Sequence, residues 1–230
     1  MARFDQHRRD RIPTPPAHDG DPVKPGAPRY VYVIDDDESV ADALTRMLST
    51  YGIEAQAFGS VEDFQSARAR LPAGCVVADV RMPGMNGLEL QRALAEDPSA
   101  PPVILITGHG DIPMAVEAMK AGAIDFLEKP IDDVALVAAI ERGFAGIRRQ
   151  EEALLASIRL KARFERLTSR ETQVMDLVVS GYSNVAIAAK LGLSARTVEH
   201  YRAQVMLKTE APNLATLVQW RSRLRNGIDA

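Results

Sequence analysis

The chain has 230 residues, 46% of them hydrophobic, which is enough for one large or two small domains with apolar cores. It has a single cysteine, Cys75, no apolar run near the ~18 residues of a membrane span, and no signal-peptide core, so we expect a soluble, cytoplasmic protein without disulfides. The net charge of −3 divides into about +1 over residues 1–28, about −10 over 29–147 and about +6 over 148–230, which indicates that only the last part meets nucleic acid or another anion.

Residues 1–28 carry six of the 14 prolines, together with Gly, Asp, His and Arg. This composition cannot support a helix or a central strand, and it predicts a disordered Pro-rich tail. A Pro-rich docking ligand is the alternative interpretation.

From residue 29 to 147, short apolar runs alternate with segments whose apolar residues recur at helical spacing. We expect strands at 30–34, 53–58, 75–78, 103–107 and 124–127, and helices at 39–50, 61–69, 87–94, 112–121 and from 134 onward. This alternation predicts an α/β domain with a doubly wound, five-stranded parallel sheet. Such sheets bind ligands at the carboxyl ends of their strands, where the strand order reverses.

Polar side chains follow four of the predicted strands. Asp35, Asp36 and Asp37 follow the first strand, Asp79 the third, Thr107 ends the fourth, and Lys129 follows the fifth. Since the carboxyl ends of parallel strands share one edge, an acidic cluster, a hydroxyl and a lysine should meet there. Clustered carboxylates repel one another unless a cation is bound, so we expect a cation-binding functional site at this edge of the sheet.

These strand ends resemble the receiver domain of two-component systems, and the FixJ subgroup in particular. The resemblance rests on the stretches 33–38, 79–87, 107–110 and 129–130, and on the run 108–123. It implies that Asp79 accepts a phosphoryl group from a histidine kinase and that the site binds Mg²⁺. By this resemblance, Asp36, Asp79 and the Arg81 backbone carbonyl bind the metal directly, and Asp35 binds it through water. Thr107 and Lys129 contact the phosphoryl group, and Phe126 is the aromatic switch residue. The resemblance also implies a cis Lys129–Pro130 bond.

Two other functions are compatible with an acidic site of this kind. A Mg²⁺-dependent phosphatase would also use an aspartyl phosphate, but it would usually need an acid/base Asp two residues later, where Arg81 stands. A receiver could instead serve as an interaction module that needs no phosphorylation. We expect a regulator that catalyses only its own phosphorylation and dephosphorylation.

Residues 148–163 form a predicted helical linker. Ile140, Phe144, Ile147, Leu154 and Ile158 recur at spacings of three, four and seven, and Glu151 interrupts them. Both a short coiled coil in a dimer and a helix packed on its own receiver fit this pattern.

Residues 164–230 carry the signals of a small four-helix domain. Thr168 and Glu171 form a capping box, Ser183 caps a second helix, and Ser194 caps a third that runs from 195 to about 208. A fourth helix starts near 212. The turn at Gly192–Ser194 joins the second and third helices into a helix-turn-helix.

This segment resembles the LuxR/NarL-type DNA-binding domain through the stretches 167–171, 184–188 and 194–199. The resemblance implies that the third helix enters the major groove. The candidate DNA contacts are Arg196, Thr197, Glu199, His200, Arg202 and Lys208. Tyr201 and Gln204 depart from the family, which usually has His and Asn at these positions.

Together, the two resemblances imply a FixJ/NarL-family response regulator with the receiver at 29–147 and the DNA-binding domain at 164–230. Phosphorylation of Asp79 would control homodimerisation and sequence-specific binding to an operator, and thereby transcription. The implied partners are a sensor histidine kinase, double-stranded DNA and a second copy of the chain, and no membrane.

Overall fold

The computed structural model describes residues 29–225, apart from residues 98, 109 and 111. The predicted tail at 1–28 therefore lies outside the described residues. The chain divides into two compact units, Met1–Ile147 and Arg148–Ala230. The helix that contains the predicted linker runs without a break from Asp133 to Glu165, so a separate linker domain stays a prediction.

The first unit contains a five-stranded sheet in the order β2-β1-β3-β4-β5, and all of its strand pairs are parallel. The strands are β1 (Tyr30–Ile34), β2 (Glu54–Phe58), β3 (Gly74–Asp79), β4 (Val103–Thr107) and β5 (Asp125–Glu128). The chain passes from β1 outward to β2 and then crosses to β3, so the order reverses between β1 and β3. This topology confirms the predicted doubly wound sheet.

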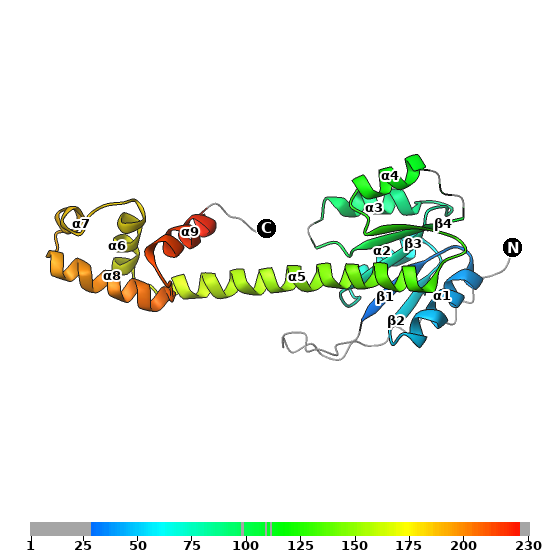
Figure 1. Ribbon diagram of the computed structural model, residues 1–230, viewed down its shortest axis with the longest axis horizontal. Helices are drawn as coiled ribbons and strands as arrows, with labels where there is room; N and C mark the ends of the chain where they lie inside the picture. Colours follow the sequence, from blue (N-terminus) through cyan, green and yellow to red (C-terminus); the bar gives the residue numbers. More distant parts are fainter. Residues whose placement is uncertain (1–28, 98, 109, 111, 226–230) are drawn as a thin grey trace. The chain divides into compact units, whose positions relative to one another are not determined.

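Helices cover both faces of the sheet (Figure 1). They are α1 (Glu38–Thr50), α2 (Val61–Arg68), α3 (Gly87–Ala95), α4 (Ile112–Lys120) and α5 (Asp133–Glu165). Alternate strand residues point to opposite faces. Val33, Val77 and Ile104 pack in one core with α1 and the first turns of α5, whereas Val76 and Leu105 pack in the other with α2, α3 and α4.

The second unit is all helical. The end of α5 is followed by α6 (Ser169–Val179), α7 (Asn184–Leu191), α8 (Ala195–Thr209) and α9 (Leu214–Arg225). Thr168, Ser183 and Ser194 cap α6, α7 and α8 as the sequence predicts, and Gly192 ends α7 in the left-handed conformation, with φ 66°. A core that includes Val198 joins α7 and α8 to α6, which confirms the predicted helix-turn-helix.

None of the helices that the structure describes combines the length and the hydropathy needed to span a bilayer.

Candidate functional site

An acidic cluster lies at the carboxyl ends of β1 and β3, where the strand order reverses. Asp79 is the last residue of β3, and Asp35 and Asp36 directly follow β1. Oxygen atoms of the three carboxylates lie within 4.8 Å of one another. Asp35 is 1% exposed and Asp79 7%, whereas Asp36 is exposed. The sheet therefore places two buried carboxylates side by side, as the strand-end pattern predicts.

Lys129 provides positive charge to this cluster from the end of β5. Its Nζ donates to Asp35 Oδ2 at 2.7 Å and lies 3.3 Å from Asp79 Oδ2. Burial raises the pKa of Asp35, an effect that the Lys129 ammonium and the Asp37 N–H oppose and the Asp79 carboxylate reinforces. Burial disfavours the charged form of Lys129 too, but the two carboxylates hold its pKa above the ordinary value. A second cation at this site would further reduce the repulsion between the Asp35 and Asp79 carboxylates.

The carboxylates also fit a divalent metal. Asp79 Oδ1 is buried and accepts no hydrogen bond from any group in the described part of the chain. Mg²⁺ binds oxygen atoms at about 2.1 Å, so two of its ligands lie at most about 4.2 Å apart. The 4.8 Å spread of the cluster needs only a small side-chain adjustment to reach that value. The Lys129 contacts show that the ammonium occupies part of the same oxygen set.

Thr107 lies on β4, the strand next to Asp79, and Phe126 lies on β5, one strand further out. Thr107 ends β4 and is fully buried, and Phe126 on β5 is half-buried and packs in the core beside α4. Gly110 crosses close over both: a Cβ added to it would lie 2.9 Å from Phe126 Cε1 and 3.1 Å from Thr107 Cγ2. The loop after β4 therefore touches the two residues to which the family resemblance assigns the switch. The Lys129–Pro130 bond is cis, as expected.

The loop after Asp79 is held from two sides. Glu62 on α2 accepts from the Met85 N–H at 3.1 Å, and Asn86 forms a capping box with Glu89 at the start of α3. Gly87 lies so close to Asp79 that a Cβ would be 2.4 Å from the Asp79 carbonyl oxygen. The role of Glu62 could not be predicted from the sequence, because no local pattern connects α2 to this loop. Arg81 lies in the same loop and its side chain is exposed.

The DNA-binding candidates lie on α8, on more than one of its faces. Arg196, Glu199 and His200 are exposed, on the side opposite to the buried Val198 and Val205. Spacings of three and four place the three exposed residues on one helix face. They form a surface that can enter a groove.

Three other candidates have partners inside the unit. Thr197 Oγ1 lies 2.7 Å from Ser194 Oγ, and Arg202 Nη1 donates to Asn184 Oδ1 at 2.7 Å. Lys208 Nζ donates to both carboxylate oxygens of Glu171, each at 2.8 Å. Glu171 is 5% exposed and also caps α6. Burial raises the pKa of Glu171, but Lys208 and the Thr168 N–H outweigh this effect and hold it below the ordinary value.

Comparison with known proteins identifies both units. Residues 31–141 match the family "Response regulator receiver domain", and residues 165–221 match "Bacterial regulatory proteins, luxR family". The transcriptional regulatory protein FixJ of Bradyrhizobium diazoefficiens is 44% identical over 197 residues, which cover 84% of this chain and 95% of that protein.

Two solved structures resemble most of this chain. The response regulator StyR is 41% identical with a TM-score of 0.71, and the match covers 86% of this chain and all of that one. Full-length FixJ from B. japonicum is 43% identical with a TM-score of 0.51, over 86% of this chain and 98% of that one. The chain therefore belongs to the FixJ-type response regulators, which are phosphorylation-regulated transcription regulators with a receiver domain and a LuxR-type DNA-binding domain.

Proposed function

We propose that Asp79 is the phosphoacceptor and that the acidic cluster works with Mg²⁺. The supporting observation is the placement of Asp79 Oδ1, which is buried beside Asp35, Asp36 and Lys129 and has no hydrogen-bond donor among the described residues. A carboxylate oxygen that no neighbour uses can act as a nucleophile or bind a metal. Asp36, Asp79 and the Arg81 carbonyl would hold the ion directly and Asp35 through water. When bound, Mg²⁺ neutralises charge on the transferring phosphoryl group.

The side chains of this site then have distinct roles. The Asp79 carboxylate oxygen attacks phosphorus, and the bond between phosphorus and the donor's leaving atom breaks as the new P–O bond forms. Lys129 exchanges part of its carboxylate contact for a phosphoryl oxygen as a point charge. The Thr107 hydroxyl donates a hydrogen bond to a phosphoryl oxygen, and Phe126 fills the space that Thr107 leaves. The donor is a sensor histidine kinase, which places the reaction in the cytoplasm.

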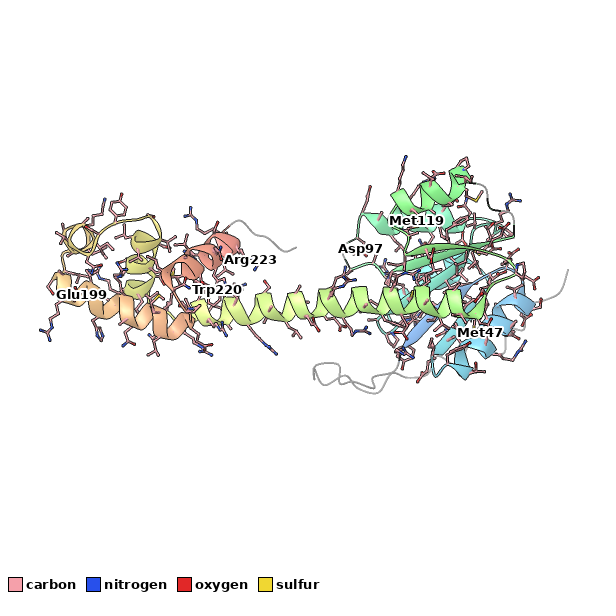
Figure 2. The ribbon with its side chains drawn as sticks, viewed as in Figure 1. Met47, Asp97, Met119, Glu199, Trp220 and Arg223 are labelled. Carbon is pink, nitrogen blue, oxygen red and sulfur yellow. The ribbon has the colours of Figure 1, made fainter. Side chains whose placement is uncertain are left out.

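Phosphorylation then acts through two helices: α4, through which two copies pair, and α8, which binds DNA. The α4 helix exposes Ile112 (81%), Val116 (46%) and Met119 (49%), and Figure 2 marks Met119 on this helix. An exposed apolar face of this kind is suited to pairing with a second copy, since burying it removes apolar surface from water. Two paired copies present two α8 helices to the half-sites of a DNA operator.

One experiment tests the phosphoacceptor. The full chain is incubated with acetyl phosphate and Mg²⁺, and its mass and operator binding are followed. We expect one phosphoryl group per chain, none on Asp79→Asn, and unchanged labelling of the control Asp42→Asn, whose side chain lies on α1 and contacts Arg46 at 3.9 Å. Equal labelling of Asp79→Asn would refute the assignment. Repeated turnover of a phosphomonoester would instead indicate a phosphatase.

A further inference from the structure

Glu199 places a negative charge on the surface of α8 that faces the nucleic acid. It is exposed one turn after Arg196 and directly before His200, on the side opposite to the buried Val198. Figure 2 marks its position near the N-terminal end of α8. DNA carries one negative charge per about 1.7 Å of its axis, so a carboxylate on this face is unfavourable unless it accepts from a donor on the DNA.

Three carboxylates in the helices that follow α5 have neighbouring cations. Glu171 pairs with Lys208, Asp176 pairs with Arg221, and Glu210 pairs with Arg163 and Arg166. Within the described part of the chain, Glu199 forms no such ion pair or hydrogen bond. Its carboxylate oxygens are therefore available to a ligand.

Base edges in the major groove differ in what they offer a carboxylate. Guanine presents the acceptors N7 and O6, thymine the acceptor O4, and adenine a donor beside the acceptor N7, whereas cytosine presents only the N4 donor. A carboxylate accepts hydrogen bonds and donates none, so cytosine is the one base whose edge does not repel it. Arg196 offers the complementary guanidinium for guanine one helical turn away.

We propose that Glu199 is a specificity-determining residue that selects cytosine at one position of each half-site. This proposal rests on the proposed function, in which α8 enters the major groove. It gives the acidic residue a role in base selection, while affinity comes from cations elsewhere on the unit. The carboxylate excludes operators that place a guanine or thymine edge at that position.

Base selection by the phosphorylated full-length chain tests this role. The wild-type protein and Glu199→Gln are each used to select binding sites from a pool of randomised duplexes. We expect one cytosine position per half-site for the wild type, and replacing that base pair should weaken binding about tenfold. Glu199→Gln should prefer adenine there, because a Gln amide both accepts from N6 and donates to N7. Glu199→Ala should lose the cytosine preference and gain none.

Glu165→Gln is the matched control, since it removes the same charge from an exposed position at the end of α5 in the same unit. It should keep the cytosine preference. If Glu199→Gln binds every sequence more tightly with the same base preferences as the wild type, Glu199 only repels DNA and the proposal is wrong. If the wild type selects no sequence at all, the proposed DNA-binding role of α8 fails as well.

Discussion

Replacing Lys129 by methionine should destabilise the receiver unit in the absence of metal. Lys129 Nζ contacts the buried carboxylates of Asp35 at 2.7 Å and Asp79 at 3.3 Å. Methionine keeps the apolar stem and removes only the charge. The two carboxylates then face each other across the site without the ammonium between them.

The contacts give the size of the effect. Removing one partner of a buried ion pair costs about 3–5 kcal/mol, because the other charge is left uncompensated. The Lys129 side chain is 22% exposed, so water screens part of its charge. Asp36 is exposed and contributes little repulsion. We therefore expect the free energy of unfolding of this unit to fall by about 2–3 kcal/mol. Saturating Mg²⁺ should restore most of this loss, since the ion replaces the missing charge.

Urea denaturation with EDTA and with Mg²⁺ measures both effects. Circular dichroism follows both units, whereas fluorescence of Trp220, the single tryptophan of the chain, follows only the DNA-binding unit and provides an internal reference. Lys120→Met is the matched control, because Lys120 is exposed at the end of α4. The reasoning is refuted if Lys129→Met stays within about 0.5 kcal/mol of the wild type without metal, the usual range for a neutral surface substitution.

Two further substitutions test close packing and charge. Gly87→Ala should lower the free energy of unfolding by about 3 kcal/mol and slow phosphorylation. The new methyl group would lie 2.4 Å from the Asp79 carbonyl oxygen and 3.0 Å from Leu105 Cδ2. Wild-type stability of this variant in urea would show that the loop adjusts freely. In the DNA-binding unit, the lowered pKa of Glu171 adds stability that is present above its ordinary pKa of 4.5 and is lost as the pH falls through the lowered value. Glu171→Gln should flatten this loss of stability in acid, as measured by Trp220 fluorescence, and equal pH profiles would contradict the role of the ion pair with Lys208.

The receiver site could be predicted from sequence because its residues share a simple geometric relation. Asp79 ends a strand and Asp35 and Lys129 each directly follow one, and parallel strands bring their carboxyl ends to one edge whatever the loops between them do. Because β1 and β3 are adjacent in the sheet, Asp35 after β1 and Asp79 at the end of β3 lie next to each other.

Contacts between helices could not be predicted in the same way. Arg202 and Lys208 look like exposed cations of the recognition helix, because helical periodicity assigns residues to faces but does not identify cross-helix partners. Asn184 lies 18 positions from Arg202 and Glu171 lies 37 positions from Lys208, and only the packing of α6, α7 and α8 brings each pair together. The motif at Thr168–Glu171 predicts the helix cap, which Glu171 does form, and gives no sign of its second bond.

The charge of the basic half therefore has two separate effects. Net charge acts at long range and draws the unit toward DNA, even where each cation already has a carboxylate neighbour. Base selection acts at contact distance and depends on the few side chains that are exposed on one helix face. On α8 the exposed face carries Arg196 and Glu199, for which we propose this role, whereas Lys208 donates to Glu171. Substitutions that change base preference should thus be found on this exposed face, whereas a substitution that changes only net charge can act from other positions of the unit.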